Sequence, residues 1–172
     1  VLVSEKGIEL DPPTVAELRE INTGATSMKV PGAKYAWRLR TKGWSLELLA
    51  RKKTPSLRSE ALHLVSVGEG VVYGNVVHNI LVTGAPVDTL QFKIPADLQS
   101  VEFVHTDLRR WTNEGETWTV KFNRKLIGNV TLAISYLHRF EPGQAVRVGG
   151  IESIGPETQT GYLIVASHLD LK

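Results

Sequence analysis

Two stretches near the middle of the chain alternate apolar and polar residues with a period of two. In residues 116–122, Trp118, Val120 and Phe122 share one face and polar residues share the other. In residues 129–136, the apolar face carries Val130, Leu132, Ile134 and Tyr136. This period, with β-branched and aromatic residues on the apolar face, is typical of half-buried strands. The stretches therefore predict a mainly β protein.

Further short strands are expected throughout the chain, separated by turn residues at intervals of about 8–12 residues. Residues 59–67 and 71–82 form a predicted hairpin, with a bulge or a bend at Gly74 and Asn75. Residues 34–40 and 44–50 form another predicted hairpin. No repeating strand–helix pattern suggests a parallel sheet, and we expect an antiparallel β-sandwich. A single domain over residues 1–172 is the expectation for a chain of this length.

One short α-helix is predicted near the N-terminus. Asp11 is a suitable N-cap, and Pro12 occupies the first helical position, where its missing N–H costs nothing. Val15, Leu18 and Ile21 then follow at helical spacing. The helix should end near residues 22–24, and at this length it must pack against the sheet to be stable.

Composition excludes several kinds of site. The chain has no cysteine, which rules out disulfides and thiolate-ligated metals, and its net charge of +2 makes no case for nucleic acid. No apolar run is long enough to insert in a bilayer. Because the chain starts at Val1 in a strand-like segment, we expect it to have been excised from a longer protein.

The two ends of the chain are similar in form. Residues 1–10 and 161–171 each contain an apolar strand, then polar residues, then an apolar–acidic–Leu triplet. Two readings stay open: one unit cut from a tandem array, or a chance match of common strand composition.

Several segments resemble β-rich segments of large uncharacterised bacterial envelope proteins. The similarity covers about half of the chain and is carried by packing motifs: residues 89–98, 101–105, Arg109-Arg110-Trp111, 118–122, 128–136 and 158–165. The resemblance implies an extracytoplasmic β-sandwich module, in the periplasm or at the cell surface. It carries over no catalytic residue.

A search for catalytic or metal-binding chemistry finds no motif. None of the five histidines pairs with another at a metal-ligand spacing, although His63 and His78 lie in neighbouring predicted strands. No serine lies on a nucleophile elbow, and no glycine-rich loop precedes a helix. Paired carboxylates for glycoside hydrolysis have no sequence motif, and the acidic candidates are Glu102, Asp107, Glu114, Glu116 and Glu152. No cofactor is expected.

Trp111 is the one aromatic residue that suggests binding. Trp37, Trp44 and Trp118 fall on the apolar sides of predicted strands, which favours the core. Trp111 instead lies in a predicted loop with Arg109, Arg110 and Asn113, a combination suited to stacking on a sugar or contacting a protein. The alternative is a Trp folded back over the end of the sandwich and covered by Arg stems.

These observations favour a non-catalytic structural or protein-interaction module of a larger extracytoplasmic protein. Its partner would be another protein or a neighbouring domain of the same chain. A carbohydrate-binding module with speculative ligand-binding residues Arg109, Arg110, Trp111 and Asn113 is the alternative, and a glycan hydrolase is the third hypothesis.

Overall fold

The computed structural model describes residues 3–141, 143 and 145–167, and their secondary structure is almost entirely β. Contacts divide the chain into two compact units, Val1–Thr54 and Pro55–Lys172. The expectation of a single domain stays a prediction. No helix among the described residues is long and apolar enough to cross a membrane.

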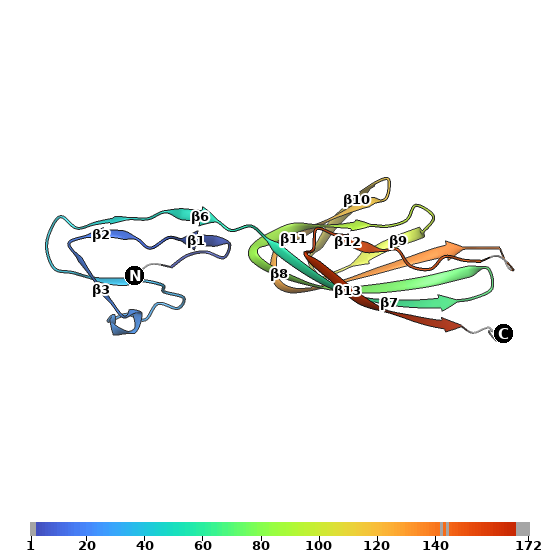
Figure 1. Cartoon of the computed structure of the whole chain (residues 1–172), viewed down its shortest axis with the longest axis horizontal. Helices are drawn as coiled ribbons and strands as arrows, with labels where there is room; N and C mark the ends of the chain where they lie inside the picture. The colour runs from blue at the N-terminus through green and yellow to red at the C-terminus, as the bar shows by residue number, and fades with distance from the viewer. Residues whose placement is uncertain (1–2, 142, 144, 168–172) are drawn as a thin grey trace. The chain divides into compact units, whose positions relative to one another are not determined.

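The second unit holds one seven-stranded mixed sheet (Figure 1). Its strands are β7 (Ser56–Val67), β8 (Val71–Lys93), β9 (Gln99–Val104), β10 (Leu108–Glu114), β11 (Thr117–Arg139), β12 (Glu152–Ile154) and β13 (Thr158–Ser167). The main order is β10-β11-β8-β7-β13, while β9 pairs with β11 and β12 pairs with β8. The predicted hairpin of residues 59–67 and 71–82 is confirmed as β7 and β8.

The two 23-residue strands β8 and β11 form the centre of this sheet. The two alternating stretches that the sequence separates are halves of the single strand β11. Residues 71–82 of β8 pair with 128–139 of β11, and residues 87–93 pair with 117–126. Between these ladders the register shifts, and Gly84 and Gly128 have φ values of +74° and +87°. Glycine tolerates this left-handed conformation, so both strands can bend there.

Of the bulge or bend predicted at Gly74 and Asn75, the bulge is wrong, because the β7–β8 and β8–β11 registers run through both residues without a shift. Gly74 has a packing role instead. A Cβ atom built on Gly74 would overlap the ring of Tyr136, so the missing side chain makes room for that ring.

The apolar faces predicted from the alternation form the core. Val120, Phe122, Val130, Leu132, Ile134 and Tyr136 are buried, and Trp118 packs against them partly buried. Residues from both halves of β8, including Ile80 and Phe92, belong to the same cluster. Burial of these faces is what the period of two in the sequence predicts.

The expectation of a purely antiparallel sheet is wrong at one strand pair. β13 runs parallel to β7 over ten residue pairs, from Thr158 beside Arg58 to Ser167 beside Val67. The chain returns from β12 to the start of β7, where the Glu157 N–H donates to the Leu57 carbonyl at 2.8 Å. The two strands therefore begin at the same level and run in the same direction, a pairing that needs a long connection.

The first unit contains three short antiparallel ladders, in which the three earlier strands pair with the three later ones in reverse order. β1 (Ile8–Leu10) pairs with β6 (Ala50–Lys52), β2 (Thr14–Ala16) with β5 (Ser45–Glu47), and β3 (Leu18–Ile21) with β4 (Ala36–Leu39). The predicted hairpin of residues 34–40 with 44–50 is wrong, since its two segments pair with strands that precede them.

The predicted N-terminal α-helix is also wrong. Residues 14–16 and 18–21 are strands, and Glu17 between them has a φ of +56°, which interrupts any helix. Thr14, Val15 and Ile21 are β-branched, and ladder partners farther along the chain satisfy this preference for strands. Among the described residues, the helical structure is a single 3₁₀ turn, η1 (Thr23–Ala25). The Asn22 side chain caps this turn by accepting from the Gly24 N–H.

The end similarity falls partly outside the described residues, which exclude 1–2 and 168–172. Within them, residues 8–10 form an antiparallel ladder and residues 161–167 form a parallel one. The tandem-array hypothesis stays a prediction.

Candidate functional site

The predicted loop around Trp111 is a strand. Arg109, Arg110, Trp111 and Asn113 all lie in β10, which pairs with the start of β11. Trp111 stands opposite the buried Val120, and its ring centroid lies 5.7 Å from that of Phe103. It is 38% exposed, so the ring packs on the core at one side and meets solvent at the other.

The four predicted binding residues do not form one face. Asn113 stands opposite Trp118 and shares the face of Trp111, whereas Arg110 stands opposite Lys121 on the other face. The register shifts between Leu108 and Arg110, which leaves Arg109 at a bulge. Trp111 and Asn113 are therefore the pair that one ligand could contact together.

Two of the five acidic candidates line one cavity. Glu116 and Glu152 border a volume of about 270 Å³ together with Asp97, Lys93 and Arg147. Lys93 stands opposite Glu152 across the β8–β12 ladder, and its ammonium lies 3.8 Å from a Glu116 oxygen. The side chains of Lys93 and Glu116 are about half exposed. Within the described residues these carboxylates thus line a solvated cavity in which Lys93 and Arg147 supply the positive charge.

The other three candidates lie on different strands or loops. Glu102 is in β9, Glu114 ends β10, and Asp107 accepts from the Arg124 guanidinium at 2.8 Å. Among the described residues, no group of three histidine, aspartate or glutamate side chains could hold a metal ion.

A polar network that the sequence analysis missed extends from the buried His78 to the exposed Gln159. The Ser59 hydroxyl lies 3.3 Å from Nδ1 of His78 and 2.8 Å from the Ser153 hydroxyl. Gln159 accepts from the Ser153 hydroxyl and from its backbone N–H. This network connects β7, β8, β12 and β13, whose serines and glutamine are common enough in strands to give no sequence signal.

The Ser59–His78 contact does not form a nucleophile and base. Both residues are buried, and Nε2 of His78 has no hydrogen-bond partner among the described residues, so no third group within them orients the ring. Burial, together with the nearby His63, lowers the pKa of His78 to about 4. The pKa of His63 is also lowered, by burial. His78 is thus a neutral core side chain at neutral pH.

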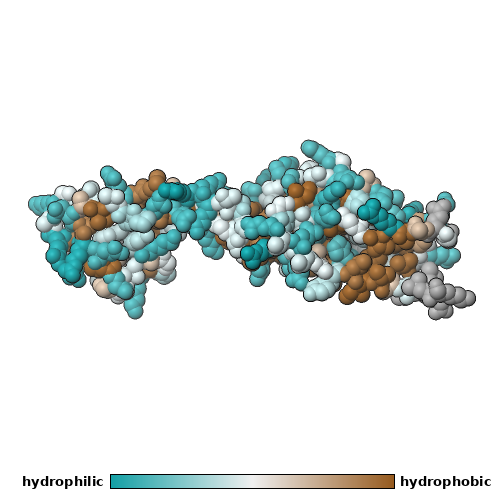
Figure 2. All heavy atoms as spheres, viewed as in Figure 1, coloured by the Kyte–Doolittle hydropathy of each residue, from teal (hydrophilic) through white to brown (hydrophobic). Residues whose placement is uncertain are grey.

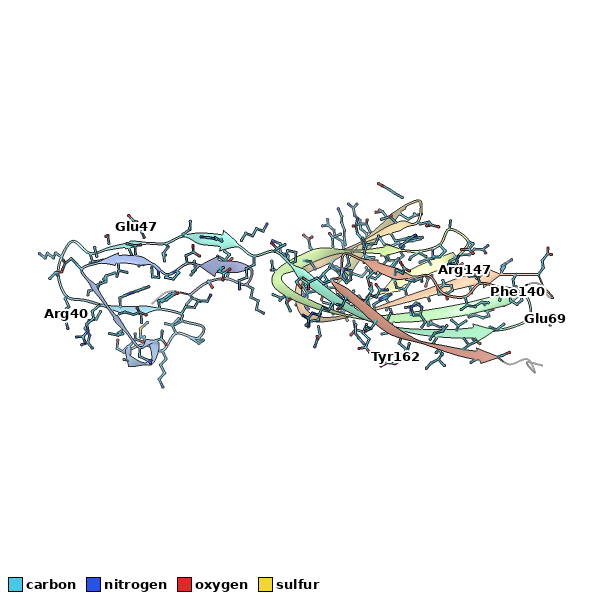
Figure 3. All side chains as sticks on the ribbon, in the orientation of Figure 1. Arg40, Glu47, Glu69, Phe140, Arg147 and Tyr162 are labelled. Carbon is cyan, nitrogen blue, oxygen red and sulfur yellow. The ribbon has the colours of Figure 1, made fainter. Side chains whose placement is uncertain are left out.

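The most unusual surface lies along β13. Six apolar residues of β7 and β13 are 40–68% exposed: Leu62, Leu64, Tyr162, Leu163, Ile164 and Val165, called here the β13 surface. Figure 2 shows a hydrophobic patch on the part of this unit where β7 and β13 end, and Figure 3 shows Tyr162 at the margin of the unit. A contiguous exposed apolar patch marks an interaction site more often than scattered apolar residues do.

The β13 surface includes both faces of the strand. Tyr162 and Ile164 stand beside Leu62 and Leu64 on the outer face, while Leu163 and Val165 stand beside His63 and Val65 on the face of the core. A continuous apolar run such as residues 162–166 is typical of strands buried on both faces. Here all five residues are exposed. The sequence of β13 is therefore typical of a buried strand, but no part of the chain that the structure describes buries it.

Comparisons with known proteins give no family. No protein-family model matches the sequence, and no curated protein matches it. Solved structures are similar only in part. An M1 zinc metallopeptidase from Deinococcus radiodurans, bound to a Tyr-Ser-Ala substrate, is 15% identical with a TM-score of 0.41, and the match covers 65% of this chain and 32% of that one.

Other partial matches are native yeast LTA4 hydrolase and a GH20 exo-β-N-acetylglucosaminidase from Vibrio harveyi. The first is 18% identical with a TM-score of 0.36 and covers 48% of this chain and 14% of that one. The second is 12% identical with a TM-score of 0.32 and covers 67% and 19%. This chain thus spans a third or less of each of these proteins, and at these scores the likeness supports no inference about activity.

Proposed function

We propose that this chain is a non-catalytic structural or protein-interaction module that docks through the β13 surface. The observation that carries the proposal is the exposure, on both faces of β13, of the uninterrupted apolar run of residues 162–166. Exposing apolar side chains to water costs free energy, at about 25 cal/mol per Å². A partner that covers these side chains would recover that free energy as binding.

We propose further that the second unit is a β-sandwich. Three ring contacts support it, because they join residues of different ladders: His78 with Phe92 at 5.1 Å, Phe92 with Phe103 at 6.0 Å and Phe103 with Trp118 at 5.7 Å. These contacts bring the two halves of β8 together across the core, as expected where a strand bends from one layer into another.

The same substitution at two valines tests the docking role. Val165 is 52% exposed in β13, and Val120 is fully buried in β11. Val165→Thr should change the free energy of unfolding by about 0.5 kcal/mol or less. Val120→Thr should cost about 1–3 kcal/mol, because its hydroxyl is buried without a partner.

Urea unfolding measures both variants, and binding of a solvatochromic dye reports the apolar surface. We expect Val165→Thr to reduce dye binding while leaving stability unchanged. A loss of stability equal to that of Val120→Thr would mean that β13 serves the fold alone, and the proposal would be wrong.

Glycan binding is a second candidate, favoured by the exposed side of the Trp111 ring and by Asn113 on the same face. Affinity electrophoresis in gels with soluble polysaccharides tests it. Trp111→Ala should abolish retardation, while Trp44→Ala, which removes another exposed tryptophan, should not. Equal mobility of the wild type in gels with and without polysaccharide would remove this candidate.

An extracytoplasmic location is also proposed, on the resemblance of the strand segments to envelope proteins. Fractionation of source cells with detection by antibody tests it, and recovery in the cytoplasmic fraction would contradict it.

A further inference from the structure

We propose that the occupant of the β13 surface is a second copy of this chain, with the two β13 strands paired antiparallel around a two-fold axis. This inference rests on the proposed docking role of β13. It adds the identity of the partner and the register of the contact.

The edge of β13 supports addition of another strand. Within the described residues β13 pairs only with β7 and ends the order of the sheet. Residues 158–166 contain no charged residue and no proline. Charged residues and prolines are the usual protection of a sheet edge, and a long apolar edge without them is a template for another strand.

Self-pairing avoids the repulsion that usually opposes it. In an antiparallel pair of identical strands every residue meets a residue of the same strand, so a charged strand often opposes like charges. β13 has none to oppose. Among the described residues, the charged neighbours of β13 on the outer face are Arg58 and Glu60 of β7, which stand beside Thr158 and Thr160. They lie one strand away from the proposed contact.

The side chains favour one register. With Leu163 on the axis, Tyr162 of each copy stands opposite Ile164 of the other, which gives two aromatic–β-branched pairs on the outer face. On the opposite face Val165 stands against Gly161, which has no side chain to pair with it. The outer rows Leu62–Tyr162 and Leu64–Ile164 of the two copies then join into one apolar patch.

This contact is expected to be modest in strength. One edge strand and six half-exposed apolar side chains make a smaller interface than the standard of about 800 Å² per partner. We therefore expect dimerisation in the micromolar range of concentration, which sedimentation velocity can follow.

A charge exchange at the axis tests the register. Leu163→Lys places two ammonium groups opposite each other, and Leu163→Glu places two carboxylates. Each variant alone should dimerise at least about tenfold more weakly than wild type, as expected for like charges directly opposite. A mixture of the two variants should recover dimer, because each lysine then faces a glutamate.

Val165 supplies the matched control, since it is equally exposed on the same face of β13 but faces Gly161 in the proposed register. Mixing Val165→Lys with Val165→Glu should not recover dimer to the same extent. Equal recovery at both positions would show an association without this register and would overturn the proposal.

Cysteine crosslinking gives an independent readout, because the chain has no native cysteine. Under mild oxidation Leu163→Cys should form a covalent dimer, since residues directly opposite in an antiparallel pair lie within disulfide reach. The two thiols of Val165→Cys would lie about four residues apart along the strand, or ~13 Å, and should not bridge.

A wild-type chain that stays monomeric up to about 200 μM, well above the micromolar range expected for so small an interface, with no selective crosslink at Leu163→Cys, would exclude self-pairing. In that case an unchanged stability and a lowered dye binding of Val165→Thr would still support docking to a different partner. The two proposals therefore fail separately.

Discussion

The two compact units of this chain use strands in different ways. Residues 55–172 bury a continuous apolar cluster between long strands, whereas in the described part of residues 1–54 the only buried side chain is that of Ala36. Leu39, Leu49 and Trp44 of the first unit are each more than half exposed. Both units consist of hydrogen-bonded ladders, so the difference lies in apolar burial.

The first unit indicates how much backbone hydrogen bonds contribute to the free energy of folding when little apolar surface is buried. A backbone hydrogen bond replaces one with water, and its net contribution is about 1 kcal/mol, near the entropy cost of ordering a residue. The three- and four-residue ladders of the first unit bury little apolar surface, so hydrophobic burial adds little to their free energy of folding. We therefore expect residues 1–54 to open locally at a lower free energy than the sheet of residues 55–172.

Truncation of a leucine should have very different effects in the two units. Leu132 is fully buried in the core, and Leu132→Ala should cost about 3–4 kcal/mol through lost burial and the cavity left behind. Leu39 is 57% exposed in β4, and Leu39→Ala should cost less than about 1 kcal/mol. Urea unfolding of both variants measures the difference, and similar losses would show that the first unit has a core of its own.

Mild acid should weaken the second unit through His78, and all five histidines lie after residue 54. Burial and His63 lower the pKa of His78 to about 4, below the ordinary value of 6.5. The unfolded chain therefore binds a proton at a higher pH than the folded one. The contribution of neutral His78 is complete above pH 6.5 and is lost as pH falls toward 4, a change of about 3 kcal/mol.

Stability measured between pH 7.5 and 4.5 checks this prediction. His78→Gln should remove most of the dependence in this window, while titration of the carboxyl groups remains in both proteins. His63→Asn is the control variant, and it should reduce the dependence partly, because the charge of His63 contributes to the lowered pKa of His78. A wild-type slope unchanged in His78→Gln would assign the dependence to other groups.

The core of the second unit could be predicted from the sequence, because burial of one strand face produces both the alternating pattern and the core. Alternation over residues 129–136 has a single interpretation, and the buried residues match it. Residues 11–21 allow more than one interpretation. The Asp11-Pro12 start and the spacing of Val15, Leu18 and Ile21 are compatible with a helix, although the structure has strands there. Residues 14–16 and 18–21 form strands because they pair with residues 45–47 and 36–39. A local sequence pattern does not contain such contacts between distant segments.

The candidate surfaces show the same limit. The sequence predicts binding at Trp111 and a core position for Trp44, whereas Trp111 is 38% and Trp44 51% exposed. The predicted loop around Trp111 is a strand, and pairing with β11 puts Arg110 on the other face. The run Tyr162-Leu163-Ile164-Val165 was visible in the sequence as a strand. That the strand lies at an edge, with both faces exposed, depends on the order of the sheet.

Substitution of Gly74 should have an intermediate effect on the second unit. A Cβ atom at this position would overlap the Tyr136 ring, which is itself buried at 3% exposure. Gly74→Ala should therefore cost about 2 kcal/mol, since neighbours must shift in a packed core. Thermal unfolding measures it, with Gly68→Ala as the control, because a Cβ there meets atoms only at ordinary contact distance, 3.6 Å or more. Equal effects of the two variants would mean that the ring adapts without strain.

The smallest effect is expected at the Arg51–Asp11 ion pair of the first unit. The Arg51 guanidinium donates to the Asp11 carboxylate at 2.6 Å, between the ends of the β1–β6 ladder. Arg51 is 65% exposed, so water screens the attraction, and Arg51→Ala should cost about 0.5 kcal/mol or less. Hydrogen exchange at the Asp11 and Lys53 amides, which donate to Leu49 and Gly7, measures the opening of this ladder directly. A change of more than about tenfold in their exchange would correspond to about 1.4 kcal/mol and would mean that charges, and not only short ladders, hold residues 1–54 together.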